Sequence, residues 1–178
     1  MTTHATATVR ADDDSQPSNR EILARLPRPH IVVAGPEKFT IQEMQTIRFA
    51  LEDRKARVTT LRMTDEFRMP EFKDAVEGCA WVLIAIDEFP GRELELLRVV
   101  EHTSLPLPCV GLICLADRVN VSNRLHVGGR IDLVVKRSPG DRSFSSHTRA
   151  RDMILALDLT DESCASAIAR AVVPHVPD

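Results

Sequence analysis

Five short, mostly apolar runs of strand length are spaced along the chain, with polar or turn-forming residues between them. They cover residues 31–34, 58–61, 81–86, 109–115 and 131–135. Runs of four to eight apolar residues bounded by turn signals are typical of buried β-strands. The run from Trp81 to Ile86 contains no polar residue, as expected of a strand that is covered on both faces of a parallel sheet. The pattern predicts five buried, parallel strands.

Helical patterns fill the intervals between these runs. Thr40 and Glu43 match the S/T-x-x-E capping box, and apolar residues then recur at helical spacing to about Arg54. Further helices are expected over 71–77, 92–102, 120–126, 148–157 and 161–173. Strands that alternate with helices imply right-handed crossovers. We therefore expect an α/β fold with three layers: a doubly wound, five-stranded parallel sheet of the flavodoxin-like type.

The 178 residues are enough for one domain and too few for two ordinary ones. Residues 1–17 carry almost no large apolar side chain, so we expect a disordered tail. Residues 18–29 begin with a second capping-box pattern and end in prolines, which predicts a short lead-in helix or, alternatively, a partner-binding arm. Residues 30–178 then form a single domain with an extra C-terminal helix.

Charge and composition exclude several function classes. Lysine and arginine number 23 against 26 acidic residues, which gives no electrostatic reason to expect nucleic acid or an anionic membrane as a partner. No apolar run approaches the roughly 20 residues that a membrane-spanning helix needs, and the N-terminus lacks the apolar core of a signal peptide. The four cysteines show no C-x-x-C spacing, and the six histidines are scattered. We expect a cytoplasmic protein without a metal site.

Candidate binding residues follow from the predicted topology. Ligands of open parallel sheets bind outside the carboxyl ends of the strands. The residues at those ends are Gly35 after the first strand, Asp87 and Glu88 after the third, and Lys136 after the fifth. Carboxylates opposite a lysine could hold a cation or a phosphoryl group. The alternative is that these charged side chains are simply solvated.

Several of these segments resemble the receiver domains of two-component response regulators. Residues 127–136, with two glycines, a strand and Lys136, are similar to the end of a receiver domain. Residues 108–117 resemble the fourth receiver strand, and residues 88–97 resemble the loop and helix that follow the third. The resemblance covers about residues 30–140 and implies a role in two-component signalling.

The chain also departs from the receiver pattern. Receivers place an acidic pair after the first strand to hold Mg²⁺, where this chain has Ala34, Gly35 and Pro36. The phosphoacceptor position is held by Ile86, with Asp87 one residue late. Without acidic ligands, the metal that neutralises a transferring phosphoryl group has no site. We therefore expect a pseudo-receiver with no cofactor, no metal and no catalytic residue, which binds a kinase, a regulator or a second copy of itself.

Two other functions remain open. Residues 33–39 and 79–85, together with residues 92–94, also resemble the group of nucleoside deoxyribosyltransferases and TIR domains. That resemblance implies an enzyme in which Glu93 attacks or stabilises the sugar carbon of a nucleoside or NAD, with Phe39 and Asp87 lining the site. The third possibility is a structural subunit whose apolar C-terminal helix mediates assembly.

Overall fold

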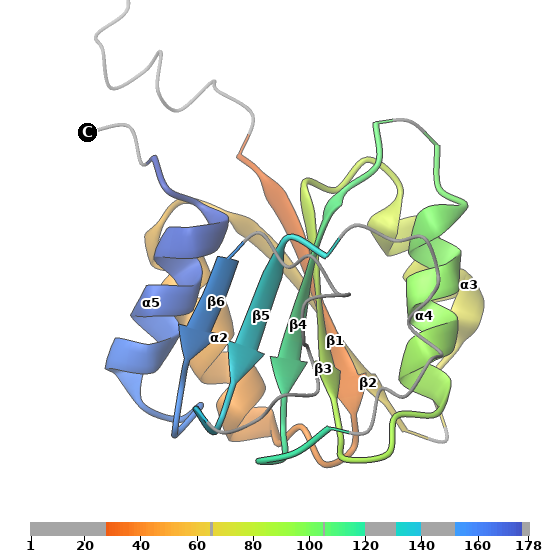
Figure 1. The fold of residues 1–178 in the computed structure, drawn as a ribbon. Coiled ribbons are helices and arrows are strands. Elements are labelled where there is room, and N and C mark those ends of the chain that lie inside the picture. Colours follow the sequence, from red (N-terminus) through yellow and green to blue (C-terminus); the bar gives the residue numbers. More distant parts are fainter. Residues whose placement is uncertain (1–27, 65, 105, 120–130, 140–151, 176–178) are drawn as a thin grey trace, which may run out of the picture.

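In the computed structural model, the described residues form one sheet of six parallel strands, in the order β2-β1-β3-β4-β5-β6 (Figure 1). The strands are β1 (His30–Pro36), β2 (Arg57–Met63), β3 (Trp81–Ile86), β4 (Cys109–Cys114), β5 (Leu133–Lys136) and β6 (Asp152–Leu155). The structure describes residues 28–64, 66–104, 106–119, 131–139 and 152–175. Within these residues every strand pair is parallel.

Helices cover both faces of the sheet. The helices α2 (Ile41–Asp53) and α5 (Glu162–Val172) pack together on one face, and α3 (Met69–Val76) and α4 (Arg92–Glu101) lie on the other (Figure 1). The predicted three-layer, doubly wound, flavodoxin-like α/β architecture is confirmed. The chain reverses its direction across the sheet between β1 and β3, which makes the carboxyl ends of these two strands the topological switch point.

Alternating side chains of the strands feed two separate cores. In β1, Ile31 and Val33 pack under α2 and α5, whereas Val32 and Ala34 pack under α3 and α4. All four side chains are fully buried, as expected for a strand covered on both faces. The same alternation along β3 and β4 explains why their sequences are almost entirely apolar.

The expectation of five strands was wrong by one. Residues 152–155 form the strand β6, which pairs parallel to β5, where the sequence pattern predicted part of a helix over 148–157. Ile154 and Leu157 are spaced as on a helix, and a short apolar segment does not distinguish the two structures by periodicity alone. Pairing with β5 decides between them, because the backbone of residues 152–156 bonds to residues 132–136.

Some predictions fall outside the described residues. These are the disordered tail over 1–17, nearly all of the lead-in helix over 18–29, and the helix over 120–126. The division into tail, lead-in helix and domain therefore stays a prediction. Among the described residues, no helix is both long and apolar enough to span a bilayer.

Candidate functional site

The loop after β1 is shaped by bonds within the chain itself. The Phe39 N–H donates to the Pro36 carbonyl at 2.9 Å and closes a tight turn. Thr40 then caps α2: its hydroxyl accepts the Glu43 N–H at 3.1 Å, while the Glu43 carboxylate accepts the Thr40 N–H at 2.9 Å. This is the capping box that the sequence predicts. It uses two of the donors that the first turn of a helix would otherwise offer to a ligand.

Phe39 lies against Gly35 at the end of β1. The Phe39 side chain is fully buried. A Cβ atom added at Gly35 would lie 2.7 Å from Phe39 Cδ1 and 2.8 Å from the Ala85 Cβ of the neighbouring strand β3. Only glycine leaves room for this close approach. The aromatic ring therefore fills the space directly above the predicted binding residue Gly35.

Arg62, near the end of β2, holds the same loop from the other side. Its Nη2 donates to the Glu37 carbonyl at 2.7 Å, and its Nε donates to the Phe39 carbonyl at 3.2 Å. A guanidinium with two bonds to one loop restricts it more than a single contact does. The turn over 36–40 is thus fixed by β2 as well as by its own hydrogen bonds.

Asp87, the first residue after β3, is paired with Lys38 of this loop. The Lys38 Nζ lies 2.7 Å from Asp87 Oδ2, and Asp87 Oδ1 accepts the Glu88 N–H at 2.8 Å. The hydrogen bond from Lys38 is the main reason that the pKa of Asp87 is lowered, and the same bond raises the pKa of Lys38. Both partners therefore stay charged at neutral pH, and the pair bridges the switch point between β1 and β3.

The predicted binding residues do not all meet at one place. Gly35 and Asp87 both lie at the switch point, although Gly35 is covered by Phe39. Glu88 is exposed beside Asp87. Lys136 ends β5, which β4 separates from β3. At the usual strand spacing of about 4.8 Å, the backbones of β3 and β5 lie roughly 10 Å apart.

Glu93, the candidate of the enzymatic interpretation, lies in the first turn of α4. Its side chain is buried, with an exposed fraction of 6%. Its Oε2 accepts the Gly91 N–H at 2.7 Å, so the carboxylate turns back on the start of its own helix. An acidic side chain at this position satisfies a helix N-terminus and interacts favourably with the helix dipole. The contact accounts for a buried glutamate without a substrate.

Three polar residues of the described structure were not singled out from the sequence. Lys38 and Arg62 close the loop at the switch point. Asp132 is buried at the other end of β5, where its Oδ2 accepts the Val110 N–H at 3.0 Å and adds one bond to the β4–β5 ladder. Asp132 could have been noticed in the sequence, because it is an acidic residue directly before an apolar strand. The other two have no local signal, because their partners lie 23 or more residues away.

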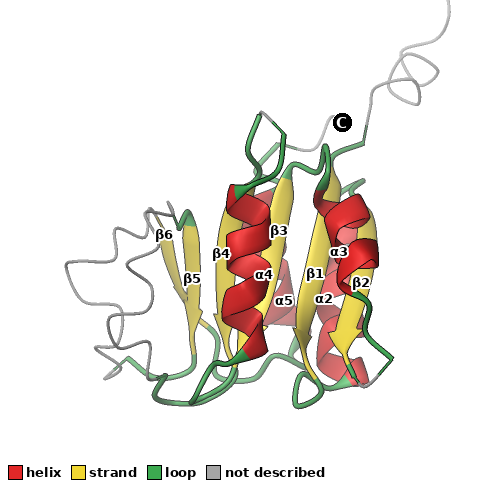
Figure 2. Cartoon of the chain, turned by 90° about the vertical axis from the view of Figure 1, so that its right-hand side faces the viewer, coloured by secondary structure: helices red, strands yellow, loops and turns green. Residues whose placement is uncertain are grey.

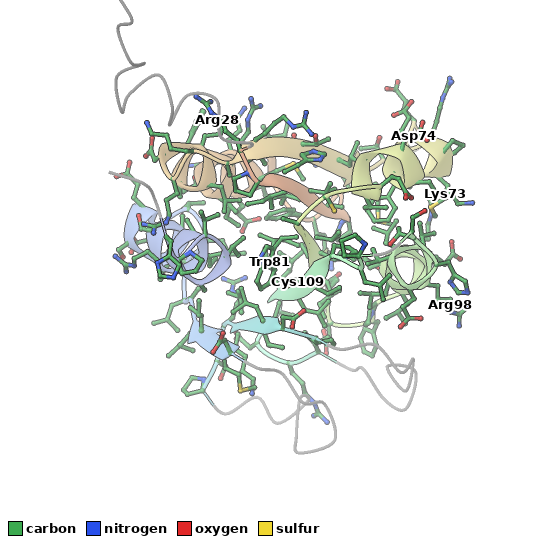
Figure 3. All side chains as sticks on the ribbon, turned by 90° about the horizontal axis from the view of Figure 1, so that it is seen from above. Arg28, Lys73, Asp74, Trp81, Arg98 and Cys109 are labelled. Atoms are coloured by element: carbon green, nitrogen blue, oxygen red, sulfur yellow. The ribbon has the colours of Figure 1, made fainter. Side chains whose placement is uncertain are left out.

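A groove of about 400 Å³ lies between α3 and α4, away from the switch point. Its lining residues are Lys73, Glu77, Arg98, Val99, His102 and Thr103. Figure 3 shows Lys73 and Arg98 on the outer sides of these neighbouring helices. Both cations lie in the last turn of their helix, where a positive charge interacts favourably with the helix dipole. The groove is open, and its charged lining residues Lys73, Glu77 and Arg98 are all exposed.

No protein-family model matches the chain, and no curated protein matches it in sequence. Solved structures match it in fold. The metal-soaked flavodiiron core from Synechocystis sp. matches with a TM-score of 0.53 and 9% identity over 82% of this chain. The chain spans only 35% of the length of that protein. This likeness shows a shared flavodoxin-like fold.

Two further structures match at lower TM-scores. A diflavin flavoprotein from Nostoc sp. matches with a TM-score of 0.45 and 11% identity, over 83% of this chain and 90% of its own. A short-chain flavodoxin associated with a bacterial microcompartment matches with a TM-score of 0.45 and 10% identity, over 83% of this chain and 97% of its own.

The fold raises the question whether the switch point fits a flavin mononucleotide. Flavodoxins bind this cofactor between β1 and β3, and phosphates in α/β folds commonly bind the free N–H groups at a helix N-terminus. Here the Glu43 carboxylate already lies at the start of α2 and would face the phosphate. Phe39 fills the space above Gly35. The residues present do not fit the cofactor.

The part of the chain that the structure describes shows no ligand set for a metal centre either. Across the described ranges, no group of three or more histidine, cysteine, aspartate or glutamate side chains is placed to hold an ion. None of the four cysteines forms a disulfide bond, and two of them, Cys79 and Cys114, are buried in the core. Asp87 has its two carboxylate oxygens bonded to Lys38 and to the backbone of Glu88.

Proposed function

We propose that this chain is a receiver-like regulatory module that acts by binding other proteins and does not turn over phosphate. The observation that carries the proposal is the pairing of Asp87 with Lys38 at 2.7 Å. Asp87 is the carboxylate nearest to the place where a receiver accepts a phosphoryl group, and here it serves as an ion-pair partner.

The surroundings of Asp87 support the same conclusion. Phosphoryl transfer requires a cation that neutralises the developing charge on the transferred group, and receivers hold it with acidic side chains after the first strand. In this chain that position is Gly35, which packs against Phe39. The positive charge of the exposed Lys38 is already balanced by the Asp87 carboxylate. It is therefore not available to neutralise a phosphoryl group.

The module would then act through its surfaces. Its fold presents helix faces and sheet edges that another protein can contact. The partner classes that fit are a histidine kinase, another regulator or a second copy of the chain. The apolar face of α5, which the assembly hypothesis used, is turned inward against the sheet and α2.

Intact-mass spectrometry after incubation with acetyl phosphate and Mg²⁺ tests the proposal. We expect the mass to stay unchanged, because no acidic pair holds the metal beside Asp87. The matched variant is Asp87→Asn, which removes the nearest acceptor and keeps the shape of the side chain. A stoichiometric gain of one phosphoryl group that disappears in Asp87→Asn would overturn the proposal.

Binding to purified histidine kinases and response regulators tests the other part of the proposal, that the module binds proteins. Surface-immobilised protein should retain at least one of them at micromolar concentration, in a manner that does not depend on acetyl phosphate. Binding that appears only after treatment with acetyl phosphate would show that the module responds to phosphorylation and would contradict the proposal.

A further inference from the structure

A cluster of basic side chains lies at the amino end of the sheet. The turn from α2 to β2 carries Arg54, Lys55 and Arg57, and β2 is the outer strand next to β1 among the described strands (Figure 2). The Arg57 N–H donates to the Pro29 carbonyl at 2.9 Å, which brings this turn beside the first described residues of the chain. Arg28 therefore lies at the same end (Figure 3). We call Arg28, Arg54, Lys55 and Arg57 the basic cluster.

Most of the positive charge of the basic cluster is not neutralised by nearby carboxylates. Arg28, Lys55 and Arg57 are exposed, and no carboxylate of the described residues lies within 4.0 Å of their charged groups. The exposed carboxylate of Asp53 on the same turn offsets one of the four charges. Burial and then the charge of Arg57 lower the pKa of His30, as expected beside concentrated positive charge.

The backbone holds two members of the basic cluster in place. The Nε and Nη2 atoms of Arg54 donate to the carbonyls of Val173 and Pro174 at the end of α5, so this guanidinium is fixed without a carboxylate partner. Lys55 has a φ of 66°, in the left-handed region where glycine is favoured directly after a helix. The lysine therefore places a charge at a position whose backbone favours glycine.

The other candidate surface for an anion is less positive. In the groove between α3 and α4, Lys73 and Arg98 lie with the carboxylate of Glu77, and Asp74 is exposed on the same helix α3. The acidic side chains offset the two basic ones. The basic cluster is therefore the better site for a run of negative charges.

The amino-acid sequence itself contains such a run. Asp12, Asp13 and Asp14 are consecutive, and only the thirteen residues 15–27 separate them from Arg28. We call these three aspartates the acidic run. Thirteen residues span up to roughly 45 Å when extended, which exceeds the diameter of a small domain, about 30 Å. The acidic run can therefore reach the basic cluster, and a short tether keeps its effective concentration there on the order of millimolar.

We propose that the acidic run binds the basic cluster of the same chain. The contact consists of exposed ion pairs, each of which contributes little alone, so it should be reversible and sensitive to salt. While bound, the run shields this corner of the sheet from other anionic groups. The contact does not rest on the proposed function, because it involves neither Asp87 nor a phosphoryl group.

Amide chemical shifts of the full chain, measured by NMR at low salt, test the proposal. The variant that neutralises the acidic run leaves every described residue unchanged and combines Asp12→Asn, Asp13→Asn and Asp14→Asn. We expect it to shift the amide resonances of Lys55 and Arg57 and to leave those of Lys73 and Arg98 in place. At about 1 M NaCl, where the Debye length is about 3 Å, the difference between wild type and variant should largely disappear.

A matched pair of charge reversals locates the contact. Lys55→Glu and Lys73→Glu make the same change of charge at two exposed lysines, one in the basic cluster and one in the α3–α4 groove. In Lys55→Glu, the shift of the Arg57 amide that follows neutralisation of the acidic run should fall at least about twofold. In Lys73→Glu, that shift should keep its wild-type size.

Three results would contradict the proposal. The first is that the Lys55 and Arg57 resonances are the same in the wild type and in the neutralised variant. The second is an equal shift at Lys73 and Arg98, because the acidic run would then lie in the α3–α4 groove. The third is a shift that grows with protein concentration, since it would show that the run binds a second copy, whereas a contact within one chain does not depend on concentration.

Discussion

The Lys38 ammonium lies 2.7 Å from the Asp87 carboxylate and ties the loop after β1 to the end of β3. These two strands flank the switch point, where open parallel sheets bind their ligands. Arg62 and Phe39 fix the same loop from β2 and from the inside. The chain thus fills its own candidate site with bonds that a ligand would otherwise make, which is why we place its function on its surfaces.

Gly35→Ala should destabilise the protein by about 1–3 kcal/mol, because the new methyl group would overlap Phe39 Cδ1 and Ala85 Cβ in a packed core. Urea unfolding followed by circular dichroism measures the change. Gly91→Ala is the control, since an added Cβ there has no atom within 4 Å, and it should cost much less. Equal costs for the two variants would show that Phe39 is free to move away.

Arg62→Lys should loosen the loop after β1. Lysine cannot form both bonds of the guanidinium, so the turn over 36–40 loses one of its supports from β2. Hydrogen exchange at the Phe39 amide, which donates to Pro36, should become faster. Arg57→Lys on the same strand is the control and should leave this exchange unchanged. Unaltered exchange in Arg62→Lys would mean that the turn holds without Arg62.

The strands were predictable wherever burial on both faces makes the sequence continuously apolar. The strand Trp81–Ile86 was predicted with its observed bounds, and the capping box at Thr40 correctly marked the start of α2. The strand β6 was missed because only one of its faces enters the core. Its outward residues Met153 and Leu155 are apolar as well, so the alternation that identifies a half-buried strand is absent.

The position of the candidate site was predictable from the sequence, but the side chains that close it were not. The rule for strand ends located Gly35 and Asp87 at one edge of the sheet. The rule says nothing of which side chains close that edge. Lys38 and Asp87 are 49 positions apart, and their contact depends on the register of β1 beside β3, which a single sequence does not specify.

Burial should protect Cys79 from alkylation. The surrounding core raises the pKa of its thiol to about 11, and only the thiolate reacts. Iodoacetamide near pH 8 should therefore modify Cys79 only in unfolded protein, as peptide mapping would show. Because the pKa in the folded state is higher than the usual 9.0, the contribution of this thiol to stability is complete below pH 9 and is lost as the pH rises toward 11. Rapid alkylation of Cys79 in folded protein would contradict this burial.

The carboxyl resonance of Asp87, followed by NMR against pH with and without millimolar Mg²⁺, tests the central claim most directly. The bond from Lys38 should hold the pKa of Asp87 below 3.8, and Lys38→Met should raise it. Because this pKa is lowered on folding, the stabilisation from Asp87 is present at neutral pH and is lost as the pH falls through the lowered value. We predict that Mg²⁺ leaves the titration of Asp87 unchanged. A Mg²⁺-dependent shift of the Asp87 resonance would show a metal-binding carboxylate and contradict the account.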